Sequence, residues 1–210
     1  WEKGENSPTW NQLREVSKKY HIPTAFFFMD CPPNFDNLPN MINYRKLVAD
    51  SIYETNSPNL INNIRKSETR REIYLDLLNE LNEDILLFKV PKLEHDTKIF
   101  SNYIREILGI SLSTQKSWYK EVNHYNFLNK WKEVLNEKLG VLIFETEGVL
   151  LEEMRALCIF HEKIPIILLN GKDSVNGRIF SLFHELTHLL LGESAICGDD
   201  ENTKEEIFCN

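Results

Sequence analysis

The pentapeptide His184-Glu185-Leu186-Thr187-His188 constrains this chain more than any other feature of its sequence. On a helix, residues four apart lie on one face, about 6 Å apart along the axis. His184 and His188 can therefore offer their imidazole nitrogens to a single cation. In the HExxH pattern two such histidines bind zinc, and the glutamate takes a proton from water at the metal. The sequence predicts His184 and His188 as metal ligands and Glu185 as the catalytic residue.

The same three side chains have a second interpretation, as the polar stripe of an ordinary amphipathic helix. The residues around them argue against it, because they are apolar around most of the helix circumference, which is typical of a buried helix. They are Ile179, Phe180, Leu182, Phe183, Leu186, Leu189, Leu190 and Leu191. Buried imidazole and carboxylate groups need partners, since an unsatisfied polar group costs about 1–3 kcal/mol. A divalent metal would be a partner for all three.

Catalytic zinc sites usually take three protein ligands, so the two histidines need a third. Glu206 is the best candidate, lying 206 − 188 = 18 residues after His188 on a helix predicted to begin near residue 203. Glu205 is the alternative, because adjacent side chains on a helix point about 100° apart and only one can face the metal. The acidic residues 199–201 are explained by the helix start, where negative charge complements the helix dipole.

Length and composition restrict the class of protein. The 210 residues are 42% hydrophobic and 27% charged, as in a soluble globular protein, and there is no apolar run of membrane-spanning length. The net charge of −8 argues against a broad nucleic-acid-binding face. No signal peptide is visible, and four scattered cysteines indicate reduced thiols in a cytoplasmic protein. These are Cys31, Cys158, Cys197 and Cys209, of which the last two are weaker candidates for the third metal ligand.

Hydrophobic periodicity and helix-breaking residues divide the chain into four parts. Residues 1–34 contain a helix from about residue 9 to 21, and residues 35–43 form a linker. Residues 44–139 form a helical region, in which we expect a break at Ser57-Pro58, a helix closed by Gly109 and a helix from Thr114 to Leu139 closed by Gly140. Two basic pairs, Arg65-Lys66 and Arg70-Arg71, are expected on a solvated face.

Residues 140–210 form the fourth part, in which short apolar runs replace the helical pattern. The runs 140–145, 156–160 and 164–169 predict three strands of a small, mainly antiparallel sheet. Asn170-Gly171 is a turn signal and Ser174 can cap the motif helix, so this helix follows directly on a strand. Arg178 is expected to anchor the helix by pairing with a carboxylate. The fold class is α+β and mostly helical.

These segments resemble a known family. Gly140–Phe144, Ile164–Asn170, Gly177–Leu191 and Glu206-Ile-Phe-Cys-Asn210 are similar to the ImmA/IrrE metallopeptidases, which pair a zinc-dependent HExxH helix with a later E-x-x-A-N-like segment. The resemblance implies a zincin-like core with the sheet packed on the HExxH helix, zinc as cofactor, and Glu206 as third ligand, with Cys209 in the small-residue place. The family helix continues beyond this segment, so we expect the C-terminus to be truncated.

The opening residues carry a second resemblance. Trp1–Thr9, Gln12-Leu13, Tyr20–Pro23, Phe27-Phe28 and Pro32-Pro33 resemble the second half of an Xre-type helix-turn-helix domain, whose groove-reading helices would precede Trp1. A small helical appendage that only packs on the main domain is an equal alternative. DNA binding is therefore expected only through a missing N-terminal half-domain.

Together the resemblances imply a zinc endopeptidase that cleaves a helix-turn-helix repressor and so derepresses mobile-element, prophage or stress genes. The alternative is a DNA-binding regulator whose peptidase-like domain senses a signal or binds a partner without cleaving it. A structural zinc site is a weaker third interpretation, since such sites tend to use four protein ligands, often thiolates. No membrane partner is expected.

Overall fold

The computed structural model describes residues 4–31, 42–43, 57–92, 96–121, 124–193, 195–197 and 204–209, and it confirms an α+β fold that is mostly helical. Seven α-helices are described: α1 (Trp10–Tyr20), α3 (Pro58–Glu80), α4 (Thr97–Leu108), α5 (Leu112–Glu121), α6 (His124–Leu139), α7 (Val175–Leu191) and α8 (Lys204–Cys209). A 3-10 helix, η1, covers Thr24–Phe28. The strands are β1 (Ile42–Asn43), β2 (Leu142–Thr146), β3 (Ala156–Ile159), β4 (Ile166–Asn170) and β5 (Ala195–Cys197).

The sheet differs from the prediction of three mainly antiparallel strands. The three predicted strands exist as β2, β3 and β4, but two short strands join them in the order β1-β5-β3-β4-β2. The pairs β3–β4 and β3–β5 are antiparallel, whereas β2–β4 and β1–β5 are parallel. The sheet is therefore five-stranded and mixed.

The difference has a physical reason. β4 lies between β2 and β3 and pairs with both, so β2 and β3, which follow each other in the chain, form no hairpin. Adjacent strands of a β-β hairpin must be antiparallel, while β2 and β4 are separated in sequence by a whole strand and can run parallel. β1 and β5 have two and three residues, too few to show a hydrophobic pattern. β1 occupies the end of the segment predicted as a linker.

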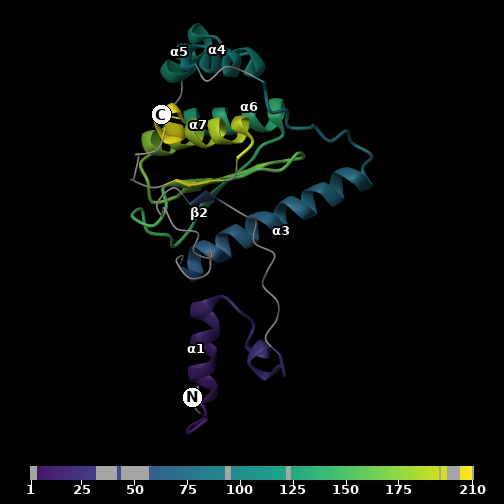
Figure 1. Cartoon of the computed structure of the whole chain (residues 1–210), viewed down its shortest axis with the longest axis vertical. Coiled ribbons are helices and arrows are strands. Elements are labelled where there is room, and N and C mark those ends of the chain that lie inside the picture. The colour runs from purple at the N-terminus through teal and green to yellow at the C-terminus, as the bar shows by residue number, and fades with distance from the viewer. Residues whose placement is uncertain are drawn as a thin grey trace.

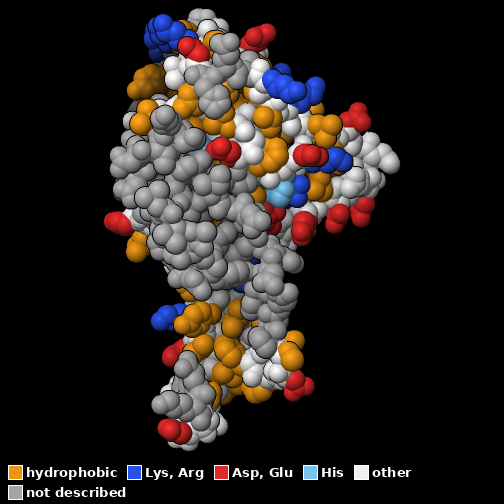
Figure 2. Space-filling model, in the orientation of Figure 1, with side chains coloured by type: hydrophobic (Ala, Val, Ile, Leu, Met, Phe, Trp, Pro, Cys, Tyr) orange, Lys and Arg blue, Asp and Glu red, His pale blue; other side chains and the backbone are white. Residues whose placement is uncertain are grey.

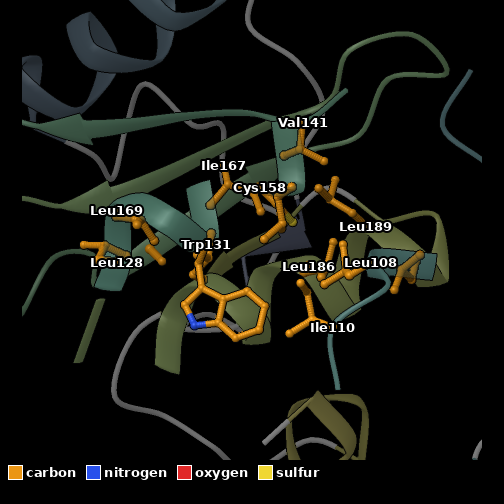
Figure 3. Packing of buried hydrophobic residues seen from close by; sticks show 14 of the residues in the cluster. Leu108, Ile110, Leu128, Trp131, Val141, Cys158, Ile167, Leu169, Leu186 and Leu189 are labelled. Carbon is orange, nitrogen blue, oxygen red and sulfur yellow. The ribbon is translucent and has the colours of Figure 1, made fainter. Parts of the chain in front are cut away.

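Alternate residues of the central strands face opposite sides of the sheet, and each side has its own core. Toward α6 and α7, Cys158, Ile167 and Leu169 pack with Leu128, Trp131, Leu186 and Leu189, whose side chains point toward one another in Figure 3. On the other side, Leu157, Ile159, Ile166 and Leu168 pack with Leu60 and Ile64 of α3. Figure 1 shows the resulting layers: α4 and α5, then α6 and α7, then the sheet, then α3.

The helices that were predicted to end at a glycine do end there. Gly109 and Gly140 follow α4 and α6 with positive φ angles of 66° and 68°, as the C-cap prediction requires. α3 begins at Pro58, as expected, with Ser57 as its cap. The single helix predicted over 114–139 is wrong, because α5 ends at Glu121 and α6 begins at His124. The part of the predicted helical region before Ser57 falls outside the described residues.

The N-terminal segment stands apart from these layers (Figure 1). α1 begins and ends as predicted, with a capping box at Thr9 and a left-handed His21 after its last turn. Leu13 is the buried hydrophobic residue of this segment, while Trp10, Tyr20, Phe27, Phe28 and Met29 are exposed. Figure 2 shows hydrophobic side chains gathered on the surface of this part of the molecule, at the bottom of the view. His21 Nε2 lies 2.7 Å from Asn59 Oδ1 of α3, so the segment contacts the main body there. Within the described residues, no helix combines the length and apolar character that crossing a membrane requires.

Candidate metal centre

A tight turn delivers the motif helix α7 directly from the end of β4. Asn170 ends β4, and its Oδ1 accepts the backbone N–H of Lys172. A Cβ at Gly171 would lie 2.6 Å from the carbonyl oxygen of Thr146, so this position needs glycine. Ser174 Oγ then accepts the N–H of Gly177 as the N-cap of α7. The predicted turn and cap are both confirmed.

Arg178, in the first turn of α7, anchors the helix as predicted. Its guanidinium is buried and forms an ion pair with Glu145 of the edge strand β2, which also binds Lys132 of α6. The guanidinium carbon lies 5.2 Å from the centre of the Tyr125 ring. These contacts join α6 and β2 to the N-terminal end of α7, about two turns before the histidines.

The two motif histidines come together as the spacing predicted. His184 Nε2 and His188 Nε2 are 3.3 Å apart, and their rings meet at an angle of 66° with centres 5.0 Å apart. Both residues are buried, His188 completely. Glu185 is also completely buried, on the same turn of α7.

This arrangement fits a zinc ion. Two nitrogens that each lie about 2.0–2.1 Å from one tetrahedral zinc are roughly 3.3–3.4 Å apart. The separation of the two Nε2 atoms, 3.3 Å, therefore matches the spacing of two ligands of the same ion. Without an ion, the same separation allows one Nε2–H to donate to the other nitrogen.

The side chain of the third predicted ligand, Glu206, is not among those that the structure describes. Glu206 lies in α8, which packs against α7, but its side chain and that of Glu205 are outside the described residues. Phe208 of α8 meets Phe100 of α4 edge to face, with ring centres 5.0 Å apart, so α8 is attached to the helical layer. Cys209 is buried, while the side chain of Cys197 in β5 is outside the described set. Among the side chains that are described, no group of three potential ligands occurs.

Glu193 is a site residue that the sequence analysis did not find. Its Oε2 lies 3.3 Å from His188 Nδ1, the nitrogen that faces away from His184. The sequence feature that could have indicated Glu193 is Gly192, which directly follows the apolar run of α7. A glycine that ends a helix in the left-handed conformation returns the next residue to the last turn.

The comparisons with known proteins point to the same part of the chain as the candidate metal centre. Residues 136–210 match the family model of the IrrE N-terminal-like domain, a peptidase family. The match covers β2 to α8, including the whole HExxH helix, and less than half of the chain. It supports the resemblance to the ImmA/IrrE family over this part. Neither the curated proteins nor the solved structures gave a match.

Proposed function

We propose that this chain is a zinc-dependent endopeptidase of the HExxH type. The observation that carries the proposal is the buried pair of imidazoles, whose Nε2 atoms lie 3.3 Å apart on one face of α7. The match of residues 136–210 to a peptidase family also supports it. α7 lies against β3 and β4, as the helix of a zincin-like core would.

The proposal gives each site residue a separate task. His184, His188 and Glu206 hold the ion, with Glu206 brought in by α8. When bound, zinc polarises a carbonyl group and lowers the pKa of water toward about 7. Glu185 accepts a proton from the attacking water and passes it to the leaving nitrogen. Its complete burial keeps bulk water away from the carboxylate, and the ion pair between Arg178 and Glu145 fixes the helix that carries it.

For the substrate we propose a helix-turn-helix repressor, whose cleavage would derepress mobile-element, prophage or stress genes in the cytoplasm. This part rests on the resemblance of residues 140–210 to the ImmA/IrrE family and of the opening segment to half of an Xre-type domain. DNA binding would belong to that N-terminal domain.

The experiment compares the chain with Glu185→Gln in zinc, each incubated with helix-turn-helix proteins encoded near its gene and examined by mass spectrometry. Glu185→Gln keeps the shape of the side chain but cannot accept the proton, so the variant should retain zinc and cleave at least about 1000-fold more slowly. Glu137→Gln, an exposed change of the same kind on α6, should cleave like the wild type.

Cleavage that persists in Glu185→Gln would contradict the assigned role. Absence of cleavage in every variant, together with intact DNA binding by the protein, would favour the non-cleaving regulator instead.

A further inference from the structure

The end of α7 returns the chain onto the histidine pair. Gly192 adopts the left-handed conformation with φ 81° and donates its N–H to the carbonyl of Leu189. The N–H of Glu193 donates to the carbonyl of His188 at 3.0 Å. These two bonds form a Schellman motif, which places the residue after the glycine beside the residue five positions earlier. The backbone alone thus brings Glu193 next to His188.

Neighbouring groups hold this turn in position. The thiol of Cys158, buried in β3, lies 3.7 Å from the carbonyl oxygen of Glu193 and donates to it. A Cβ added to Gly192 would lie 3.5 Å from Cγ2 of Val90. The turn is therefore attached to the sheet by the Cys158 thiol and lies close to Val90, in the segment after α3.

In the Schellman motif, the side chain after the glycine usually makes an apolar contact with the last turn. Here the contact is polar, because Glu193 Oε2 lies 3.3 Å from His188 Nδ1. A carboxylate only accepts hydrogen bonds, so it favours the imidazole tautomer that carries its proton on Nδ1. The lone pair of His188 then lies on Nε2, which faces His184 Nε2.

We propose that Glu193 is a positioning residue of the metal centre, which fixes the ring orientation and tautomer of His188 for coordination. The proposal rests on the proposed zinc site but concerns a residue outside the HExxH motif. Carboxylate partners of metal-bound histidines also raise the basicity of the ligand, and their loss typically weakens metal binding by 10–100-fold. Glu193 touches neither the ion nor the substrate in this account.

The test has two readouts, and the first needs no metal. Long-range ¹H–¹⁵N NMR of the metal-free chain at about pH 8 reports which nitrogen of His188 carries the proton. We expect Nδ1–H in the wild type, and a shift toward Nε2–H in Glu193→Ala. The second readout is zinc affinity, measured by competition with a chelator.

We expect zinc to bind Glu193→Ala 10–100-fold more weakly than the wild type. The loss in Glu193→Gln should be smaller, because its amide oxygen can still accept Nδ1–H. The matched control is Glu137→Gln, which makes the same charge change on an exposed face of α6 and should bind zinc like the wild type. Circular dichroism of each variant confirms that the fold is retained.

Two results would overturn the proposal: a wild-type His188 with its proton on Nε2, or equal zinc affinity in the wild type and Glu193→Ala. A wild type that takes up no zinc would refute the zinc peptidase, and the tautomer readout would then test only whether Glu193 sets the position of the proton on His188. The failure of one proposal is thereby distinguished from the failure of the other.

Discussion

At the scale of single residues, a buried amide organises the entry to the motif helix. Asn170 is completely buried at the end of β4. Its Nδ2 donates to the carbonyls of Met154 at 2.7 Å and Leu150 at 3.3 Å, while its Oδ1 accepts the N–H of Lys172. One side chain thus ties the loop before β3 to the turn before α7.

Replacing this amide should destabilise the fold. Asn170→Ala removes the side-chain donor of the buried Met154 carbonyl and the acceptor of the Lys172 N–H, so we expect the free energy of unfolding to fall by about 2–3 kcal/mol. Urea denaturation measures it. The control Asn102→Ala, on the exposed side of α4, should change the same quantity by less than about 0.5 kcal/mol. An equally small effect of Asn170→Ala would show that the loop does not depend on this amide.

At the scale of elements, α3 is attached to the sheet by a charged side chain as well as by its apolar face. Arg71 donates through Nε to the carbonyl of Ile164 at 2.8 Å and through an Nη to the carbonyl of Lys163 at 2.7 Å. Burial lowers the pKa of Arg71, against the opposing effect of Glu68 and Glu72. The group still remains charged at neutral pH, because an arginine pKa lies far above 7. Arg71 is half-buried and hydrogen-bonded to the loop before β4, so it is only partly on the solvated face that the sequence predicted.

Arg71→Lys should therefore not be a conservative change. A lysine cannot offer the planar fork that reaches two carbonyls, so we expect a loss of about 1–2 kcal/mol in the free energy of unfolding. The neighbouring Lys66→Ala, exposed on the same helix, is the control and should stay within about 0.5 kcal/mol. Thermal and urea unfolding of the two variants give the comparison, and equal stabilities would remove the role assigned to Arg71.

Elements that local chemistry determines were predictable from the sequence. Gly109 and Gly140 end helices because they supply positive φ, and Ser174 caps α7 through a residue three positions away. His184 and His188 meet because the helix period brings them together. The strand order and the contacts of Arg71 depend on residues distant in sequence, such as Lys163, 92 positions away, and no local pattern encodes them.

At the scale of the whole molecule, the helix that carries the candidate metal centre contacts both the sheet and the other helices of the C-terminal half. α7 lies between the sheet and the layer of α4 and α5 (Figure 1), while α8 packs on both α7 and α4. A zinc ion held by two histidines of α7 and Glu206 of α8 would link this short last helix to the core. Metal binding and the docking of α8 should accordingly be coupled.

Zinc affinity, measured by chelator competition, tests the central claim most directly. We expect one zinc per wild-type chain, and at least about 100-fold weaker binding in His184→Ala and in His188→Ala, because each variant removes one of the three proposed ligands. His161→Ala is the matched control, since His161 pairs with Glu68 away from the site, and it should bind zinc like the wild type. A wild type that binds no zinc at micromolar concentrations, or a His184→Ala variant that binds it as tightly as His161→Ala, would contradict the account.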